Sequence, residues 1–112
     1  MITQYIFLVS DIKSIKKGAL IAQACHSAIK AIKLFRSNSD TQLYLKSLDT
    51  MTTVILKIKK EDILEIKETL SSLDIVEWIE QPENIITCLA LRPYNLVDLQ
   101  DYLSFIKKFS LF

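Results

Sequence analysis

Glycine, histidine and cysteine are scarce in this chain of 112 residues, and this excludes several kinds of site. The single glycine, Gly18, rules out the GxGxxG and GxxxxGK[ST] loops that hold dinucleotides and nucleoside triphosphates. The two cysteines, Cys25 and Cys88, have unlike neighbours and lack the spacing of a zinc site. No EF-hand loop or nucleophile elbow is present either. We therefore expect neither a metal nor a cofactor.

Long apolar runs and export signals are also missing. No apolar stretch approaches the roughly 20 residues of a membrane-spanning helix. The first residues, MITQYIFLVSD, lack the basic start and the cleavage site of a signal peptide. We therefore expect a cytoplasmic protein with no membrane partner and with reduced thiols, although the sequence leaves a Cys25–Cys88 disulfide open. With one glycine and two prolines, flexible linkers are not expected, and residues 1–112 are predicted to form one domain.

Charge is unevenly distributed although the net charge is only +1. Residues 1–36 carry a net charge of +5, and the remainder carries −4. A basic N-terminal third suits an anionic partner, and lysines at the start of a helix suit a phosphate group. Charge alone, however, favours the alternative of a solvated helix face.

Strands and helices are predicted to alternate. The apolar runs at 5–9 and 86–91 indicate buried central strands, 53–59 indicates a strand with one apolar face, and 75–80 indicates an edge strand. Helices are expected at about 18–36, 40–48, 61–73 and 96–105, with a Ser39–Gln42 capping box and an Asn95 cap. The apolar ending KKFSLF is expected to dock on the body. This order predicts a layered α/β or α+β domain with a mixed sheet.

The helix over 18–36 is expected to have two faces. The packing face would comprise Ile21, Ala24, Cys25, Ala28, Ile32 and Phe35, and the polar stripe would comprise Ala19, Gln23, His26, Lys30 and Lys33. His26 is therefore not a core histidine, and Gln23 is placed to orient its imidazole; an exposed histidine without function is the alternative. Neighbouring helix residues point about 100° apart, so Cys25 and His26 cannot form a nucleophile–base pair. Both cysteines are expected to be small buried hydrophobes.

Two stretches carry a family resemblance. LVSDIKSIKKGALIAQACHSAIKA, residues 8–31, resembles the first strand, loop and helix of the type 2 peptidyl-tRNA hydrolases, including their Ala-Gln-x-x-His pattern. WIEQPENIITCLALRPY, residues 78–94, and the ending KKFSLF resemble one subgroup more closely, the peptidyl-tRNA hydrolase domain-containing proteins. The resemblance implies an α/β fold with a four-stranded mixed sheet flanked by helices on both faces. It also implies metal-free cleavage of the ester that joins a peptide to the 3′ ribose of tRNA.

The resemblance also implies site residues. The catalytic candidates are Lys17, His26, Glu80 and Thr87, and the tRNA-binding candidates are Lys13, Lys16, Lys17, Gln23, Lys30 and Lys33. The family has lysines on both sides of its loop glycine, and the second is linked to catalysis; here Ala19 takes that position. The segment before the last strand, EQPENIIT, is shorter than in the family, with Glu80 in place of an aspartate.

These departures leave two functions open. The first is a peptidyl-tRNA hydrolase. The second is a catalytically weak or inactive relative that acts as a tRNA-binding or protein-interaction module, the latter through the tail around Phe109 and Phe112. A homodimer is also open, since no sequence feature fixes the oligomeric state.

Overall fold

Two buried strands form the centre of the sheet. In the computed structural model, which describes residues 1–112, β1 (Ile2–Val9) lies between β2 (Thr53–Ile58) and β4 (Ile85–Leu91). β3 (Ile75–Glu80) pairs with the outer side of β4, which confirms the predicted edge strand. β1 pairs parallel with β2 and antiparallel with β4, so the sheet is mixed. A two-residue strand, β5 (Tyr94–Asn95), pairs with the start of β1 and makes one strand more than expected.

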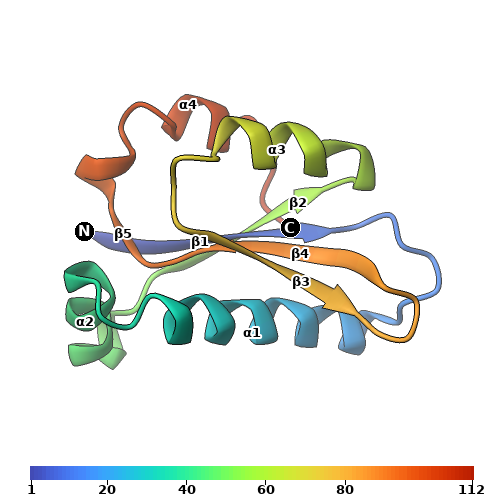
Figure 1. The fold of residues 1–112 in the computed structure, drawn as a ribbon, viewed down its shortest axis with the longest axis horizontal. Helices are drawn as coiled ribbons and strands as arrows, with labels where there is room; N and C mark the ends of the chain where they lie inside the picture. The colour runs from blue at the N-terminus through green and yellow to red at the C-terminus, as the bar shows by residue number, and fades with distance from the viewer.

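Helices cover both faces of this sheet, as the α/β prediction required (Figure 1). α1 (Lys17–Leu34) lies along one face, with α2 (Ser39–Lys46) beyond its end, and α3 (Ile63–Thr69) and α4 (Leu103–Ile106) lie on the other. None of these helices combines the length and the apolar character that crossing a bilayer requires.

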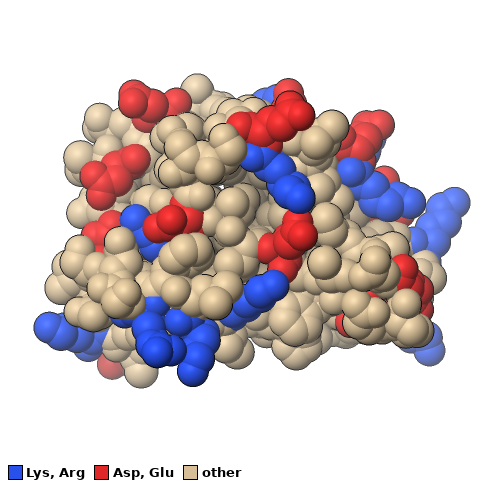
Figure 2. All heavy atoms as spheres, in the orientation of Figure 1, with Lys and Arg blue, Asp and Glu red and all other residues tan.

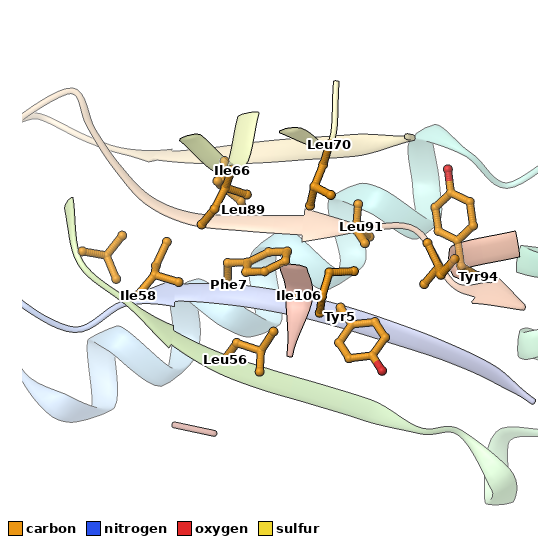
Figure 3. Packing of buried hydrophobic residues seen from close by; sticks show 12 residues of the cluster. Tyr5, Phe7, Leu56, Ile58, Ile66, Leu70, Leu89, Leu91, Tyr94 and Ile106 are labelled. Carbon is orange, nitrogen blue, oxygen red and sulfur yellow. The ribbon is translucent and has the colours of Figure 1, made fainter. Parts of the chain in front are cut away.

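The alternation of side chains along β1 feeds two hydrophobic cores. Tyr5, Phe7 and Val9 point into the larger core under α3 and α4 (Figure 3), while Ile6 and Leu8 point towards α1. β1 is therefore apolar on both faces, which explains why its sequence is a continuous apolar run and does not alternate.

The packing face of α1 is rotated from the predicted one. Ala24 is buried as expected, but Gln23 is only 2% exposed and Ile21 is 55% exposed. Cys25 is exposed, so its predicted burial is wrong. Buried Ala24, Ser27 and Ala31 are small and allow the helix to approach the sheet closely. The helical wheel failed because it ranks positions by hydrophobicity, whereas hydrogen bonds with the sheet bury Gln23.

Several predicted helix ends also shift. α2 is capped by Asn38, whose side chain accepts a hydrogen bond from the Asp40 N–H at 2.9 Å, and not by the predicted Ser39–Gln42 box. After the short turn η1 (Leu48–Thr50) and β2, the third helical segment starts with the 3₁₀ turn η2 (Lys60–Asp62). The last helix is split into η3 (Leu96–Leu99) and α4, although the Asn95 cap is confirmed by a bond from the Val97 N–H.

The C-terminal tail docks on the body, as predicted. Phe109 packs edge-on against Phe7, with ring centroids 6.0 Å apart, and is therefore not free to bind a partner. Leu111 forms a bridge with Leu56, and the Ser110 carbonyl accepts a hydrogen bond from the Lys57 N–H at 2.9 Å. The tail thereby covers the outer edge of β2, where unpaired backbone groups would otherwise be open to another strand.

Candidate active site

A cleft lies between the start of α1 and the turn that joins β3 to β4. Its volume is about 320 Å³. One wall comes from the loop before α1 and its first turn, and the other from the β3–β4 hairpin. The lining residues are Ser14, Ile15, Lys16, Ala19, Glu80, Gln81, Glu83 and Ile85. A lysine and two carboxylates thus face one hollow, a setting for charged substrates.

A buried glutamine joins the two walls. The Gln23 Nε2 group donates to the Glu80 Oε2 atom at 2.6 Å and to the Ala19 carbonyl at 3.2 Å. The Thr87 hydroxyl donates to Gln23 Oε1 at 3.0 Å. Because a reversed amide would place its oxygen against the carboxylate and the carbonyl, these partners fix its orientation. Glu80 is therefore held at the cleft wall by a network in which every polar atom of Gln23 has a partner.

Thr87→Val tests this network. Thr87 has no exposed surface, and valine preserves its shape but removes the donor to Gln23 Oε1. Since a buried acceptor then loses its partner, the free energy of unfolding is expected to fall by about 1–3 kcal/mol. Urea denaturation measures this loss. The control is Thr69→Val, the same change at an exposed position, where a shift within about 0.5 kcal/mol is expected. Equal losses in the two variants would contradict the network.

His26 lies one turn further along α1 than Gln23, on the same side of the helix but outside the cleft lining. The expectation that Gln23 orients its imidazole is wrong, because the Gln23 amide is fully used by Glu80, Ala19 and Thr87. The imidazole instead packs on the indole of Trp78, with ring centroids 4.9 Å apart and planes 35° apart. Both imidazole nitrogens remain without a hydrogen-bond partner from the protein.

The lysines of this region fall into two groups. Lys30 is half-buried, and its ammonium donates to the Glu77 carbonyl of β3 at 2.8 Å. This hydrogen bond links the edge strand to α1, so the Lys30 ammonium group is already engaged within the protein. Lys13, Lys16, Lys17 and Lys33 are exposed and form no ion pair, so these four remain free for an anionic partner. Figure 2 shows basic side chains gathered over the C-terminal half of α1, the half that carries Lys30 and Lys33.

Lys16 lines the cleft, and Lys17 does not. Lys16, Ala19 and Gln23 are spaced by three and four residues, so they share one side of α1, whereas Lys17 points about 100° away from Lys16. This spacing is visible in the sequence, and it is the signal that could have identified Lys16 as a residue of the cleft. Gln23, at 2% exposure, offers no surface to an RNA phosphate.

The two cysteines have opposite environments. Cys88 has no exposed surface, as predicted, and its sulfur lies 2.9 Å from the Ser27 hydroxyl. Burial raises the pKa of the Cys88 thiol to about 12, against a smaller opposing effect of the Ser27 hydrogen bond. Cys25 is exposed, and the two thiols are not joined. Elsewhere, no three His, Cys, Asp or Glu side chains converge as a metal site would require.

This difference predicts thiol reactivity. In folded protein at pH 8, one of the two thiols is expected to react with Ellman's reagent, because with a pKa of about 12 only about one in 10⁴ Cys88 thiols would be ionised. Both should react in denaturant. The absorbance of the released chromophore gives the number of thiols that have reacted. In Cys25→Ser no rapid reaction is expected, and a rapid reaction there would contradict the burial of Cys88.

Comparison with known proteins identifies the family. The family model described as "Peptidyl-tRNA hydrolase PTH2" matches residues 2–111. The chain belongs to the PTH2 family. It is 44% identical over 119 aligned residues to the Mus musculus protein named "Putative peptidyl-tRNA hydrolase PTRHD1", and 43% identical over 119 to the Homo sapiens protein of that name. Each alignment covers all of this chain and 83% of the relative. The resemblance found in the sequence is thereby confirmed.

Among the PTH2-family positions expected from the sequence, the structure brings Glu80 and Thr87 together through Gln23. It places His26 beside this group and leaves Lys17 outside the cleft. Trp78 was missed as the neighbour of His26, whereas Lys16, expected as a tRNA-binding residue, also lines the cleft. Trp78 begins the second family-like stretch, but that stretch does not show its contact with His26, which depends on how the edge strand is placed against α1.

Proposed function

We propose that this PTH2-family chain hydrolyses the ester bond between a peptide and the 3′ ribose of tRNA in the cleft at the start of α1. The observation that carries the proposal is the Thr87–Gln23–Glu80 network, which fixes a carboxylate at the wall of a cleft that also holds Lys16. Family membership and the names of the two relatives support the substrate class.

In the proposed reaction, water attacks the ester carbonyl carbon. Glu80 holds the water at the cleft wall, and His26, one helical turn beyond Gln23 and outside the cleft lining, accepts its proton through one bridging water molecule. Positive charge from Lys16 in the cleft lining stabilises the developing oxyanion, and Lys17, which lies outside the cleft, adds only its longer-range charge. The bond from the carbonyl carbon to the ribose O3′ then breaks, O3′ takes up a proton, and the peptide leaves as a carboxylic acid. Thr87 has no exposed surface, so it acts only through Gln23.

The tRNA is expected to lie along α1, from the exposed lysines at the cleft to Lys33 in the last turn of the helix. Lys13, Lys16, Lys17 and Lys33 are free to contact phosphates, while Lys30 contributes by holding β3 in place. Each phosphate contact releases counterions, so the affinity should weaken as salt is raised.

Turnover of N-acetyl-aminoacyl-tRNA by the purified protein tests the proposal. Release of the N-acetyl amino acid well above the uncatalysed rate is expected. The His26→Gln variant serves as a matched background, and circular dichroism confirms folding. Folded protein that binds tRNA but releases no product would overturn the hydrolase assignment.

A tRNA-binding module without hydrolysis is the second candidate. Ala19 favours it, because this cleft residue takes the position of the lysine that the family links to catalysis, and its side chain brings neither charge nor donor. This function predicts salt-sensitive tRNA binding with no product release and with little effect of His26→Gln.

A further inference from the structure

Three residues of the polar stripe of α1 contact β3. Gln23 bonds to Glu80, His26 packs on Trp78, and Lys30 bonds to the Glu77 carbonyl. The stripe thus attaches α1 to the edge strand at three points, and the aromatic pair is the middle one. Trp78 therefore lies between two hydrogen bonds that fix the strand on which it is carried.

The indole supports the imidazole from the protein side. Trp78 is half-buried and packs against the smaller core, whereas His26 is exposed. A base in catalysis is normally oriented by a third group that bonds to it. Here no protein group forms a hydrogen bond with the His26 imidazole. Its contact with the Trp78 indole is therefore what restrains the orientation of the ring. An offset aromatic contact at this spacing is worth about 0.5–1.5 kcal/mol, enough to favour one orientation of the ring.

The indole nitrogen adds a second observation. Trp78 Nε1 is buried and has no hydrogen-bond partner, although an unsatisfied buried donor is destabilising. Phenylalanine would fill much of the same space without this cost. The N–H group of Trp78 therefore makes no bond that phenylalanine would lose, and Trp78→Phe isolates the contribution of the ring surface.

We propose that Trp78 is a positioning residue that holds the imidazole of His26 in its working orientation. The catalytic part of this inference rests on the proposed hydrolase function. The orientation itself does not, and it can be measured separately because the chain has one tryptophan and one histidine.

Nuclear magnetic resonance of the imidazole C–H protons measures the orientation. In the folded protein these protons are expected upfield of their positions in an unstructured peptide, because they lie over the indole. The shift should persist in Trp78→Phe and disappear in Trp78→Leu, with both variants confirmed as folded by circular dichroism. Unshifted imidazole protons in the folded wild-type protein, or a shift unchanged in Trp78→Leu, would overturn the positioning role.

Kinetics measure the catalytic consequence. Trp78→Leu is expected to lower kcat about 10- to 100-fold with little change in KM, because misplacing a reacting group is costly while binding is unaffected. Trp78→Phe should restore most of kcat. A rise in KM at unchanged kcat would show that the pair acts in binding and would overturn catalytic positioning. Absence of hydrolysis in the wild-type protein would refute the proposed function. The imidazole proton shifts would still show whether Trp78 orients His26.

Discussion

Glu80→Gln is expected to lower kcat/KM for peptidyl-tRNA about 100-fold while leaving the fold intact. Glutamine keeps the shape of the side chain, and its carbonyl still accepts the Gln23 Nε2 hydrogen bond that now reaches Glu80 at 2.6 Å. The variant therefore removes the negative charge without breaking the network. The loss is of the size found when a group that holds or deprotonates a reacting water is removed. Steady-state kinetics on N-acetyl-aminoacyl-tRNA measure it.

Glu83→Gln is the matched control for Glu80→Gln. Glu83 lines the same cleft and undergoes the same change of charge, but it has no contact with Gln23. A change of less than about threefold is expected there, since only the general electrostatic potential of the cleft is altered. Equal losses in the two variants would show that cleft charge, and not the position of the Glu80 carboxylate, controls the rate.

Ala19→Lys is expected to raise kcat/KM about 10- to 100-fold. Ala19 is exposed in the cleft wall, and its carbonyl already accepts from the Gln23 amide that holds Glu80. A lysine there places an ammonium group beside the carboxylate and near the developing oxyanion, where one donor is commonly worth about 10²–10³ in rate. It also introduces the residue that the family resemblance implies for this position.

Ala19→Met separates charge from bulk in this experiment. Methionine is nearly as long as lysine and equally flexible, but it carries no charge or donor. No gain is expected with methionine. A similar gain in both variants would assign the effect to packing. If Ala19→Lys has the same rate as the wild-type protein, Lys16 already supplies the positive charge that the reaction needs.

The succession of strands and helices along the chain, and the central or edge position of most strands, could be predicted from the sequence because these signals are local. The run YIFLV is apolar throughout and became a strand covered on both faces, and IVEWIE became the edge strand. Asn95 capped the last helical segment as expected. The added strand β5 was missed because two residues carry no periodicity.

The candidate site could be predicted only in part, because its geometry depends on contacts between distant segments. The helical wheel placed Gln23 and His26 correctly on one side of α1. It gave Gln23 the wrong partner, since Glu80 and Thr87 follow it by more than fifty residues and reach it only when β3 and β4 pack on α1. The exposure of Cys25 has the same origin, because a helix that buries Gln23 and Ala24 directs Cys25, about 200° from Gln23, away from the sheet.

The two walls of the cleft come from separate stretches, residues 14–19 of the loop and α1 and residues 80–85 of the β3–β4 hairpin. The segment between them contributes α2, β2 and α3, and the exposed turn Leu48–Thr50 lies near the opposite end of α1 from the cleft (Figure 1). Insertions there are therefore expected to disturb neither wall. A fluorescent reporter or an affinity peptide placed within this turn should therefore leave the catalytic parameters unchanged, which gives the molecule a natural attachment point for single-molecule work on tRNA.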